Sequence, residues 1–268
     1  KLKKEDLFKN SKTQIVFLEN IRFYEQEEKN DQNFSKHLAK LADIFVNDAF
    51  SCSHRAHASV SKITEFLPSY AGLQLETEIN ALKKVTSEIK KPITCIIGGS
   101  KISTKITVIS NLIRSTSNIV VVGAMANNFL LYKNYEIGKS LKENNSSETV
   151  KKILQEAEEH KCNIIVPEDC LVSKSLKGDA VVKDIRSIEK DDVILDVGPQ
   201  TLKNLEKIID NSNTIMWNGP AGYYENKNFA GGTNFIAQKI SYNTSKKSLV
   251  SVLGGGDTVS AINKSGLK

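Results

Sequence analysis

The residues best suited to chemistry follow an apolar run, where Gly98-Gly99-Ser100-Lys101 is followed four positions later by Lys105. The run over 93–97 predicts a buried strand, and apolar residues recur at helical spacing from Ile102 onward. Glycine lets a ligand approach the backbone, and the N-terminus of a helix attracts an anion. We therefore expect a phosphate-binding turn, with both lysines on one face of the first helical turns. The alternative is an ordinary strand-to-helix turn with solvated lysines.

Two further glycine-rich turns are Trp217-Asn218-Gly219-Pro220-Ala221-Gly222 and Gly254-Gly255-Gly256-Asp257-Thr258. Several such turns at one edge of a sheet would form a crevice floored by backbone, which suits a flat base and a polyphosphate. Asp257 is placed either to hold a hard cation such as Mg²⁺ or to cap the next helix. Glu225, after Tyr223-Tyr224, is either a ligand for ribose hydroxyls or a surface charge.

A third cluster lies in the polar loop 51–59, which contains His54, Arg55 and His57 although the chain has only four histidines. Arginine presents a rigid two-pronged clamp to an oxyanion, and histidine adds a second donor. We expect this loop to grip a phosphate or a carboxylate. A helix start with exposed basic side chains is the alternative.

The pattern from Pro92 onward alternates apolar runs with helical segments. Strands are expected at 93–97, 118–122, 163–166, 193–197, 214–217 and 249–253, with helices at 102–113, 126–131, 148–160, 201–210 and 233–240. This α/β alternation predicts one parallel sheet covered by helices on both faces, with ligands beyond the carboxyl ends of its strands. Gly123 and Gly198 would then lie at the same edge as the other glycine turns.

The preceding segment carries weaker patterns. We expect a short strand at 14–18, a solvated acidic loop at 25–31, an amphipathic helix at 34–42 and a strand at 43–50. A long helix ended by Pro92 is expected from Ala71, and it would suit a connector between two α/β segments.

Composition limits the possible functions. The chain has 268 residues, 40% of them hydrophobic, and a net charge of +6, which is too mild to argue for nucleic acid. The four cysteines show no CxxC spacing, so we expect reduced thiols and neither a disulfide framework nor a zinc site. No apolar stretch has transmembrane length and no signal peptide is evident, so we expect a cytoplasmic protein without a membrane partner.

Together, these motifs resemble those of the phosphoglycerate kinase family. The resemblance rests on Leu18–Phe23, Val46–Phe50 with His54–Ser59, Gly98–Lys101 with Lys105, Trp217–Pro220 and Gly254–Thr258, in the family's order and with its spacing. It implies Mg²⁺-dependent phosphoryl transfer between 1,3-bisphosphoglycerate and ADP, giving 3-phosphoglycerate and ATP in glycolysis.

The resemblance also implies a monomer of two Rossmann-like three-layer αβα domains with parallel sheets, joined by a long interdomain helix and closed by hinge bending. On this basis we expect a partial phosphoglycerate-binding domain at 1–70, the interdomain helix at 71–91 and a nucleotide-binding domain at 92–268.

The resemblance assigns roles to individual residues. Lys101, with Arg22 and Arg55, is implied to be catalytic, and Arg22, His54, Arg55 and His57 to bind phosphoglycerate. The implied nucleotide-binding residues are Gly99, Ser100, Lys105, Gly123, Asn218, Pro220, Gly222, Glu225, Gly254, Gly255, Gly256, Asp257 and Thr258, with Asp257 also on Mg²⁺.

The chain departs from the family pattern at both ends. The family's opening segment and its final glycine-rich turn and helix have no counterpart, so we expect a truncated chain. Within the matched part, Ser51-Cys52-Ser53 replaces the usual Gly-Thr-Ala, and Ser100 stands where alanine is common. The alternatives to a working kinase are a remnant that binds adenine nucleotide without catalysis, and a Rossmann-type oxidoreductase. The absence of a G-x-G-x-x-G fingerprint disfavours the oxidoreductase.

Overall fold

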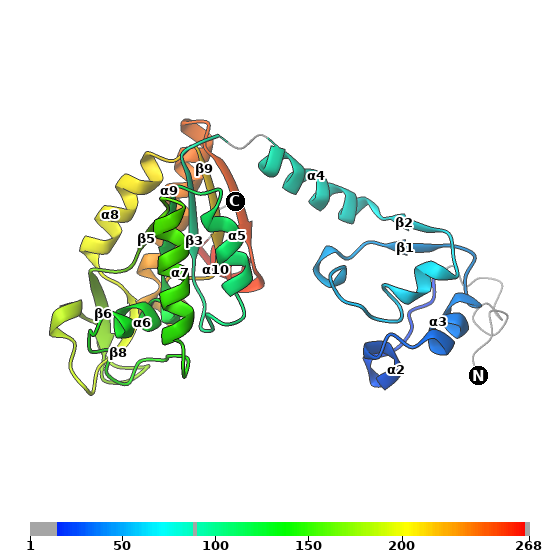
Figure 1. The fold of residues 1–268 in the computed structure, drawn as a ribbon, viewed down its shortest axis with the longest axis horizontal. Helices are drawn as coiled ribbons and strands as arrows, with labels where there is room; N and C mark the ends of the chain where they lie inside the picture. The colour runs from blue at the N-terminus through cyan, green and yellow to red at the C-terminus, as the bar shows by residue number, and fades with distance from the viewer. Residues whose placement is uncertain (1–14, 88–89, 266–268) are drawn as a thin grey trace. The chain divides into compact units, whose positions relative to one another are not determined.

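The computed structural model describes residues 15–87 and 90–265, and the chain divides into two compact units, Lys1–Thr86 and Ser87–Lys268. The second unit contains the larger sheet and the predicted phosphate-binding turn (Figure 1). Within the described ranges, no helix is long and apolar enough to cross a membrane.

The first unit contains two short strands, β1 (Phe45–Asn47) and β2 (Ser69–Ala71), which pair in parallel. Among its described residues no other strands pair, and residues 15–18 are in no strand, so the predicted strand at 14–18 is wrong over that range. The other elements are η1 (Ile21–Phe23), α2 (Glu25–Glu28), α3 (Gln32–Ala39), η2 (Phe50–Cys52), η3 (Lys62–Glu65) and α4 (Leu73–Ser87).

The acidic segment 25–31 is not the solvated loop that the sequence predicts. Its first four residues form α2, residues 29–31 lie outside any helix or strand, and the Glu27 side chain is buried. The Glu27 carboxylate accepts hydrogen bonds from the backbone N–H and the hydroxyl of Ser59 at 2.9 and 2.6 Å. The sequence does not indicate which acidic residue of this run is buried, because the hydrogen-bond partner of Glu27 lies 32 residues away.

The second unit is organised around a five-stranded parallel sheet in the order β10-β9-β3-β4-β5. These strands confirm five of the six predicted ones, with small shifts at their ends: β3 (Ile93–Ile97), β4 (Asn118–Val121), β5 (Asn163–Ile165), β9 (Thr214–Asn218) and β10 (Val250–Gly254). The helices are α5 (Ile106–Ile113), α6 (Gly123–Tyr132), α7 (Ser147–Glu159), α8 (Pro199–Asp210), α9 (Gly231–Lys246) and α10 (Gly256–Ser265), with η5 at Lys227–Phe229.

Apolar side chains cover both faces of this sheet. Cys95 and Ile97 of β3 pack with Val121 against α5, α6 and α7, whereas Ile96 packs with Val120 against α8 and α9. Successive strand residues point to opposite faces, which explains why fully buried strands are continuously apolar. Figure 1 shows helices flanking this sheet, which gives the predicted layered α/β arrangement.

The predicted strand at 193–197 exists, but its predicted place in the parallel sheet is wrong. It is β8 (Val193–Val197), which belongs to a three-stranded antiparallel sheet in the order β7-β6-β8. Its partner is β6 (Asp169–Ser173), which also pairs with β7 (Val181–Asp184); η4 (Ile185–Ser187) follows. An apolar run does not encode strand direction, and the mostly exposed β7 gives no run at all.

The predicted long helix appears as α4, which belongs to the first unit up to Thr86. Residues 88–89 of the predicted helix lie outside the described residues. The division into 1–70, 71–91 and 92–268 stays a prediction, as does the second Rossmann-like domain.

Candidate functional site

A cleft opens at the carboxyl ends of β3, β9 and β10, where three glycine turns meet. Its polar end is a cavity of about 250 Å³ with Lys101, Lys105, Asn218 and Asp257 in its walls. Its apolar end is a cavity of about 360 Å³. Both cavities are lined by Gly99, Ser100, Pro220 and Asp257, so they form one continuous cleft.

The turns after β3 and β9 lie in direct backbone contact. The Gly98 N–H donates to the Asn218 carbonyl at 2.8 Å, and a side chain added at Gly98 would collide with the Pro220 carbonyl oxygen. Gly219 has a φ of +100°, a left-handed conformation that glycine adopts without strain. These glycines therefore serve two functions: they let two turns close on each other, and they leave the floor of the cleft as bare backbone.

Lys105 connects these turns. Its ammonium donates to the Gly98 carbonyl and to the Asn218 side-chain oxygen, both at 2.7 Å. Burial lowers its pKa below the usual lysine value, while the Asp257 charge acts in the opposite direction. A cation held here by oxygen atoms alone is well placed for a phosphate.

The two lysines do not share a helix face, as the sequence predicts they would. Residues 101–105 form bends and turns, and α5 begins only at Ile106, with Lys105 at its N-cap. The buried Ile102 side chain fits the apolar spacing of a helix but belongs to the turn. Lys101 is exposed at the polar end of the cleft, while Lys105 is half-buried.

The third glycine turn, which follows β10, contains Asp257 and Thr258. The Thr258 hydroxyl oxygen accepts from the Gly219 N–H at 2.7 Å, which fixes α10 against the turn after β9. Asp257 lies in the first turn of α10, which begins at Gly256, so the N-cap alternative for Asp257 is wrong. Its carboxylate is exposed and makes no ion pair within the part of the chain that the structure describes. An exposed carboxylate in a polar cavity fits Mg²⁺, which prefers oxygen ligands and keeps some of its water.

The apolar end of the cleft contains the remaining predicted nucleotide residues. Gly123, Gly222 and Glu225 line this cavity, together with Tyr224, whose ring lies 5.1 Å from the Lys264 ammonium. Gly254 is the exception: it ends β10 and lines neither cavity. The cleft thus brings together all but one of the residues expected to bind nucleotide.

Asp196, at the end of β8, is a wall residue to which the sequence assigned no role. It is buried, and its carboxylate accepts from the Gly232 N–H at 2.7 Å and the Val197 N–H at 2.9 Å. Burial raises the pKa of Asp196 to about 7, against the lowering effect of these two hydrogen bonds. A side chain at Gly222 or Gly232 would collide with this carboxylate, so Asp196 determines how closely both glycines approach.

The residues expected to bind phosphoglycerate lie in the first unit. Arg22 belongs to η1, and the side chains of Arg22, His54 and Arg55 are exposed, without ion pairs among residues 15–87 and 90–265. His57 is half-buried, with its Nδ1 3.7 Å from a Glu27 carboxylate oxygen. Because Glu27 also binds Ser59, it anchors the loop that carries these basic side chains.

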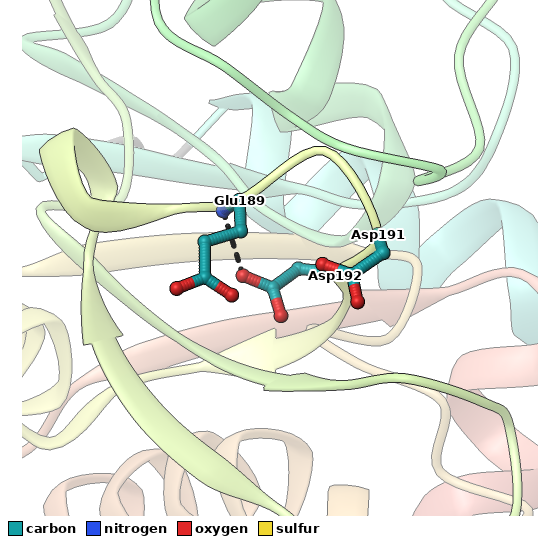
Figure 2. Close-up of side chains that lie close together, drawn as sticks. All are labelled: Glu189, Asp191 and Asp192. Carbon is teal, nitrogen blue, oxygen red and sulfur yellow. Dashed lines mark hydrogen bonds between the residues drawn. The ribbon is translucent and has the colours of Figure 1, made fainter.

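A cluster of carboxylates outside the cleft comprises Glu189, Asp191 and Asp192 (Figure 2). Lys174 contacts all three, at 2.8, 2.6 and 2.9 Å, and Lys183 lies 2.8 Å from Asp192. The hydrogen bonds that the Lys174 ammonium donates to Asp191, Glu189 and Asp192 raise the pKa of Lys174. These lysines already neutralise the acidic cluster, so it is an ion-pair network between the 189–192 turn and the β6–β7 hairpin.

Comparisons with known proteins give a consistent result. The family model described as phosphoglycerate kinase matches residues 2–268. The chain is 50% identical over 254 residues to the phosphoglycerate kinase of Wolbachia pipientis subsp. Culex pipiens (strain wPip), covering 94% of this chain and 64% of that protein. It is 43% identical over 255 residues to that of Bartonella henselae, with the same two coverages.

Two solved structures are similar as well. Phosphoglycerate kinase from Coxiella burnetii superposes with a TM-score of 0.81 at 37% identity, over 92% of this chain and 64% of that one. The enzyme from Pyrococcus horikoshii OT3 gives a TM-score of 0.80 at 29% identity, over 93% and 64%. The chain therefore spans less than two thirds of the length of these relatives.

Proposed function

The chain belongs to the phosphoglycerate kinase family, a family of phosphotransferases, and from this premise we propose that it binds Mg-ADP and Mg-ATP in the cleft of its second unit. The substrates proposed for transfer are 1,3-bisphosphoglycerate with ADP, and 3-phosphoglycerate with ATP. Membership in a phosphotransferase family removes the oxidoreductase alternative.

The observation that carries this proposal is the convergence of Lys105, Asn218 and Asp257 with bare glycine backbone at one end of an otherwise apolar cleft. A nucleotide has the matching polarity, with a charged phosphate chain and a flat base. In the proposed arrangement the phosphates lie over Gly99 and the Gly255–Thr258 turn. Glu225, which lines the apolar end, accepts hydrogen bonds from ribose hydroxyls.

Asp257 is the residue proposed to hold Mg²⁺, through its exposed carboxylate. When bound, Mg²⁺ neutralises phosphate oxygens, as it does in other phosphoryl-transfer enzymes. Lys101 and Lys105 add positive charge at the same end of the cleft. Preorganised cations stabilise the charge on a transferring phosphoryl group without being consumed. No covalent nucleophile from the chain is required.

Lys101 is proposed as the catalytic lysine, because it is exposed at the polar end while Lys105 is held by two oxygens. Arg22 and Arg55 are proposed to complete the charge neutralisation from the first unit, with His54 and His57 supporting the grip on phosphoglycerate. Closure of the protein around both substrates would exclude the water that hydrolyses an acyl phosphate.

A second candidate function is nucleotide binding without catalysis. The observation that favours it is that the chain covers only 64% of the length of its relatives. The residues that line the cleft all belong to the second unit, which supports nucleotide binding as a function that needs no side chain of the first unit. We further propose a cytoplasmic monomer without nucleic-acid or membrane partners.

Two measurements test the proposal. Calorimetric titration of the 268-residue chain with Mg-ADP should give saturable one-site binding. A coupled assay with ATP and 3-phosphoglycerate should then give turnover. Binding without turnover favours the second candidate. Absence of binding, in a chain that circular dichroism shows to be folded, would overturn both.

A further inference from the structure

The buried carboxylate of Glu27 holds one end of the basic loop 51–59. Its side chain is 2% exposed and accepts hydrogen bonds from the N–H and the hydroxyl of Ser59 at 2.9 and 2.6 Å. Its Oε1 also lies 3.7 Å from the Nδ1 of His57, which is too long for a hydrogen bond but short enough for electrostatic attraction. One carboxylate therefore contacts two residues of the loop.

The other end of the basic segment is attached to β1. The side-chain amide of Asn47 donates to the Ser53 hydroxyl at 3.0 Å. Residues 53–56 are all exposed, so they are not held by packing against a core. The two basic residues between these attachments, His54 and Arg55, therefore depend for their position on polar contacts at either end.

A further attachment, at Ala58, does not use the Glu27 side chain. The Ala58 N–H donates to the backbone carbonyl of Glu27 at 2.9 Å, and the Ala58 carbonyl accepts from the Ser35 hydroxyl at 3.0 Å. Both bonds remain when only the side chain of Glu27 is changed. A buried carboxylate loses its hydration, a cost that a neutral side chain of the same size would avoid. The charge on Glu27 therefore points to a function beyond packing.

We infer that Glu27 is a positioning residue, whose carboxylate holds the segment 57–59 and thereby presents the basic side chains of the loop to an anionic substrate. These side chains are those of His54, Arg55 and His57. The inference deepens the proposed function and rests on it, because the substrate is the phosphoglycerate proposed above. Donors that supporting hydrogen bonds already hold in place lose less conformational freedom when a ligand binds.

The test compares Glu27→Gln with Glu28→Gln in the 268-residue chain. Glutamine has almost the size of glutamate and lacks its charge, and the exposed Glu28 of the same helix is a matched control. In calorimetric titrations, Glu27→Gln should raise the Kd for 3-phosphoglycerate about tenfold, because a smaller fraction of the molecules then holds the loop in its binding arrangement. Glu28→Gln should leave this Kd within about twofold of the wild-type value.

Amide hydrogen exchange, followed by NMR, separates positioning from general loosening of the first unit. The Ser59 amide should exchange about tenfold faster in Glu27→Gln than in Glu28→Gln, because it loses a charged acceptor. The Phe45 amide, which donates to the Pro68 carbonyl in the same unit, should exchange at the wild-type rate. Saturating 3-phosphoglycerate should slow the exchange of Ser59 in Glu27→Gln, because ligand and carboxylate stabilise the same loop arrangement.

Each contrary result has a distinct meaning. An unchanged Kd for 3-phosphoglycerate in Glu27→Gln overturns the inference, and so does an equal rise in Glu28→Gln. Faster exchange at Phe45 as well as at Ser59 assigns Glu27 to the stability of the whole unit, and an exchange rate at Ser59 that ignores the ligand removes the link to binding. If the wild-type chain binds no 3-phosphoglycerate, the proposed substrate itself fails and the inference falls with it.

Discussion

The ammonium of Lys105 lies 2.7 Å from the side-chain oxygen of Asn218, a residue 113 positions later in the chain. With the bond from Lys105 to the Gly98 carbonyl, this contact closes the turn after β3 onto the turn after β9. A phosphate bound in the cleft would accept a hydrogen bond from the same ammonium.

Replacing Lys105 tests whether the polar end binds phosphate. Lys105→Met should weaken ADP binding roughly 10- to 100-fold, because a charge-assisted hydrogen bond contributes about 1.5–3 kcal/mol. Adenosine has no phosphate, so its affinity should change less than about twofold. Calorimetric titration of both ligands makes the comparison. Equal losses for ADP and adenosine would mean that Lys105 acts only by holding the two turns together.

Lys101 should affect turnover rather than binding. Its side chain is exposed, so removing it should leave the packing of the other residues that line the cleft unchanged. Lys101→Ala should lower kcat by about 10²- to 10³-fold through loss of transition-state charge stabilisation, while the Kd for Mg-ADP stays within about threefold. The coupled assay measures kcat, and calorimetry measures the Kd for Mg-ADP. A large rise in the Kd would assign Lys101 to ground-state nucleotide binding instead.

The Asp257 carboxylate should act through the metal. Asp257→Ala should weaken ADP binding in the presence of Mg²⁺ by about tenfold more than in the presence of EDTA, because only the metal complex needs this oxygen ligand. Glu148→Ala, which removes an acidic side chain from α7, serves as the control and should leave both affinities unchanged. If Asp257→Ala weakens both forms equally, its role is to support the turn rather than to hold Mg²⁺.

The raised pKa of Asp196 predicts that the free energy of unfolding decreases as the pH rises from about 4 to about 7. Its folded pKa of about 7 lies above the ordinary aspartate value of 3.8. The folded protein therefore holds this proton where the unfolded chain has lost it. The contribution of Asp196 to stability is fully present below about pH 4 and is lost as the pH rises towards 7.

Asp196→Asn removes the titrating carboxyl group. The loss of stability that Asp196 causes as the pH rises should therefore be absent in this variant. The free energy of urea unfolding, measured between pH 5 and pH 8, gives the comparison. The fluorescence of Trp217 is a suitable probe, because this buried residue is the only tryptophan. Parallel pH curves for the wild type and Asp196→Asn would contradict the elevated pKa.

Much of the second unit follows from the sequence. Continuous apolar runs predicted β3, β4, β5, β9 and β10, because burial on both faces leaves no polar alternation. Glycine turns after these runs predicted the edge where the cleft opens. These features are local, so a single chain reveals them.

What could not be predicted depends on distant partners. The direction of β8 is set by its pairing with β6, and the burial of Glu27 by Ser59. The ligand-binding role predicted for Lys105 stays a prediction, and the sequence did not indicate that its ammonium contacts the Gly98 carbonyl and the Asn218 side-chain oxygen.

The contact between Thr258 and Gly219 joins segments of the chain that are far apart in the sequence. The residues that line the polar end lie between positions 99 and 258, and among the described strands β10 pairs with β9 alone. Pairing of distant segments is slow, because loop-closure entropy must be overcome first. An intermediate that has assembled only β3, β4 and β5 lacks both Asn218 and Asp257. A state in which β9 and β10 have not joined the sheet should therefore have no affinity for nucleotide, so bound nucleotide should slow unfolding without speeding the pairing of β3, β4 and β5.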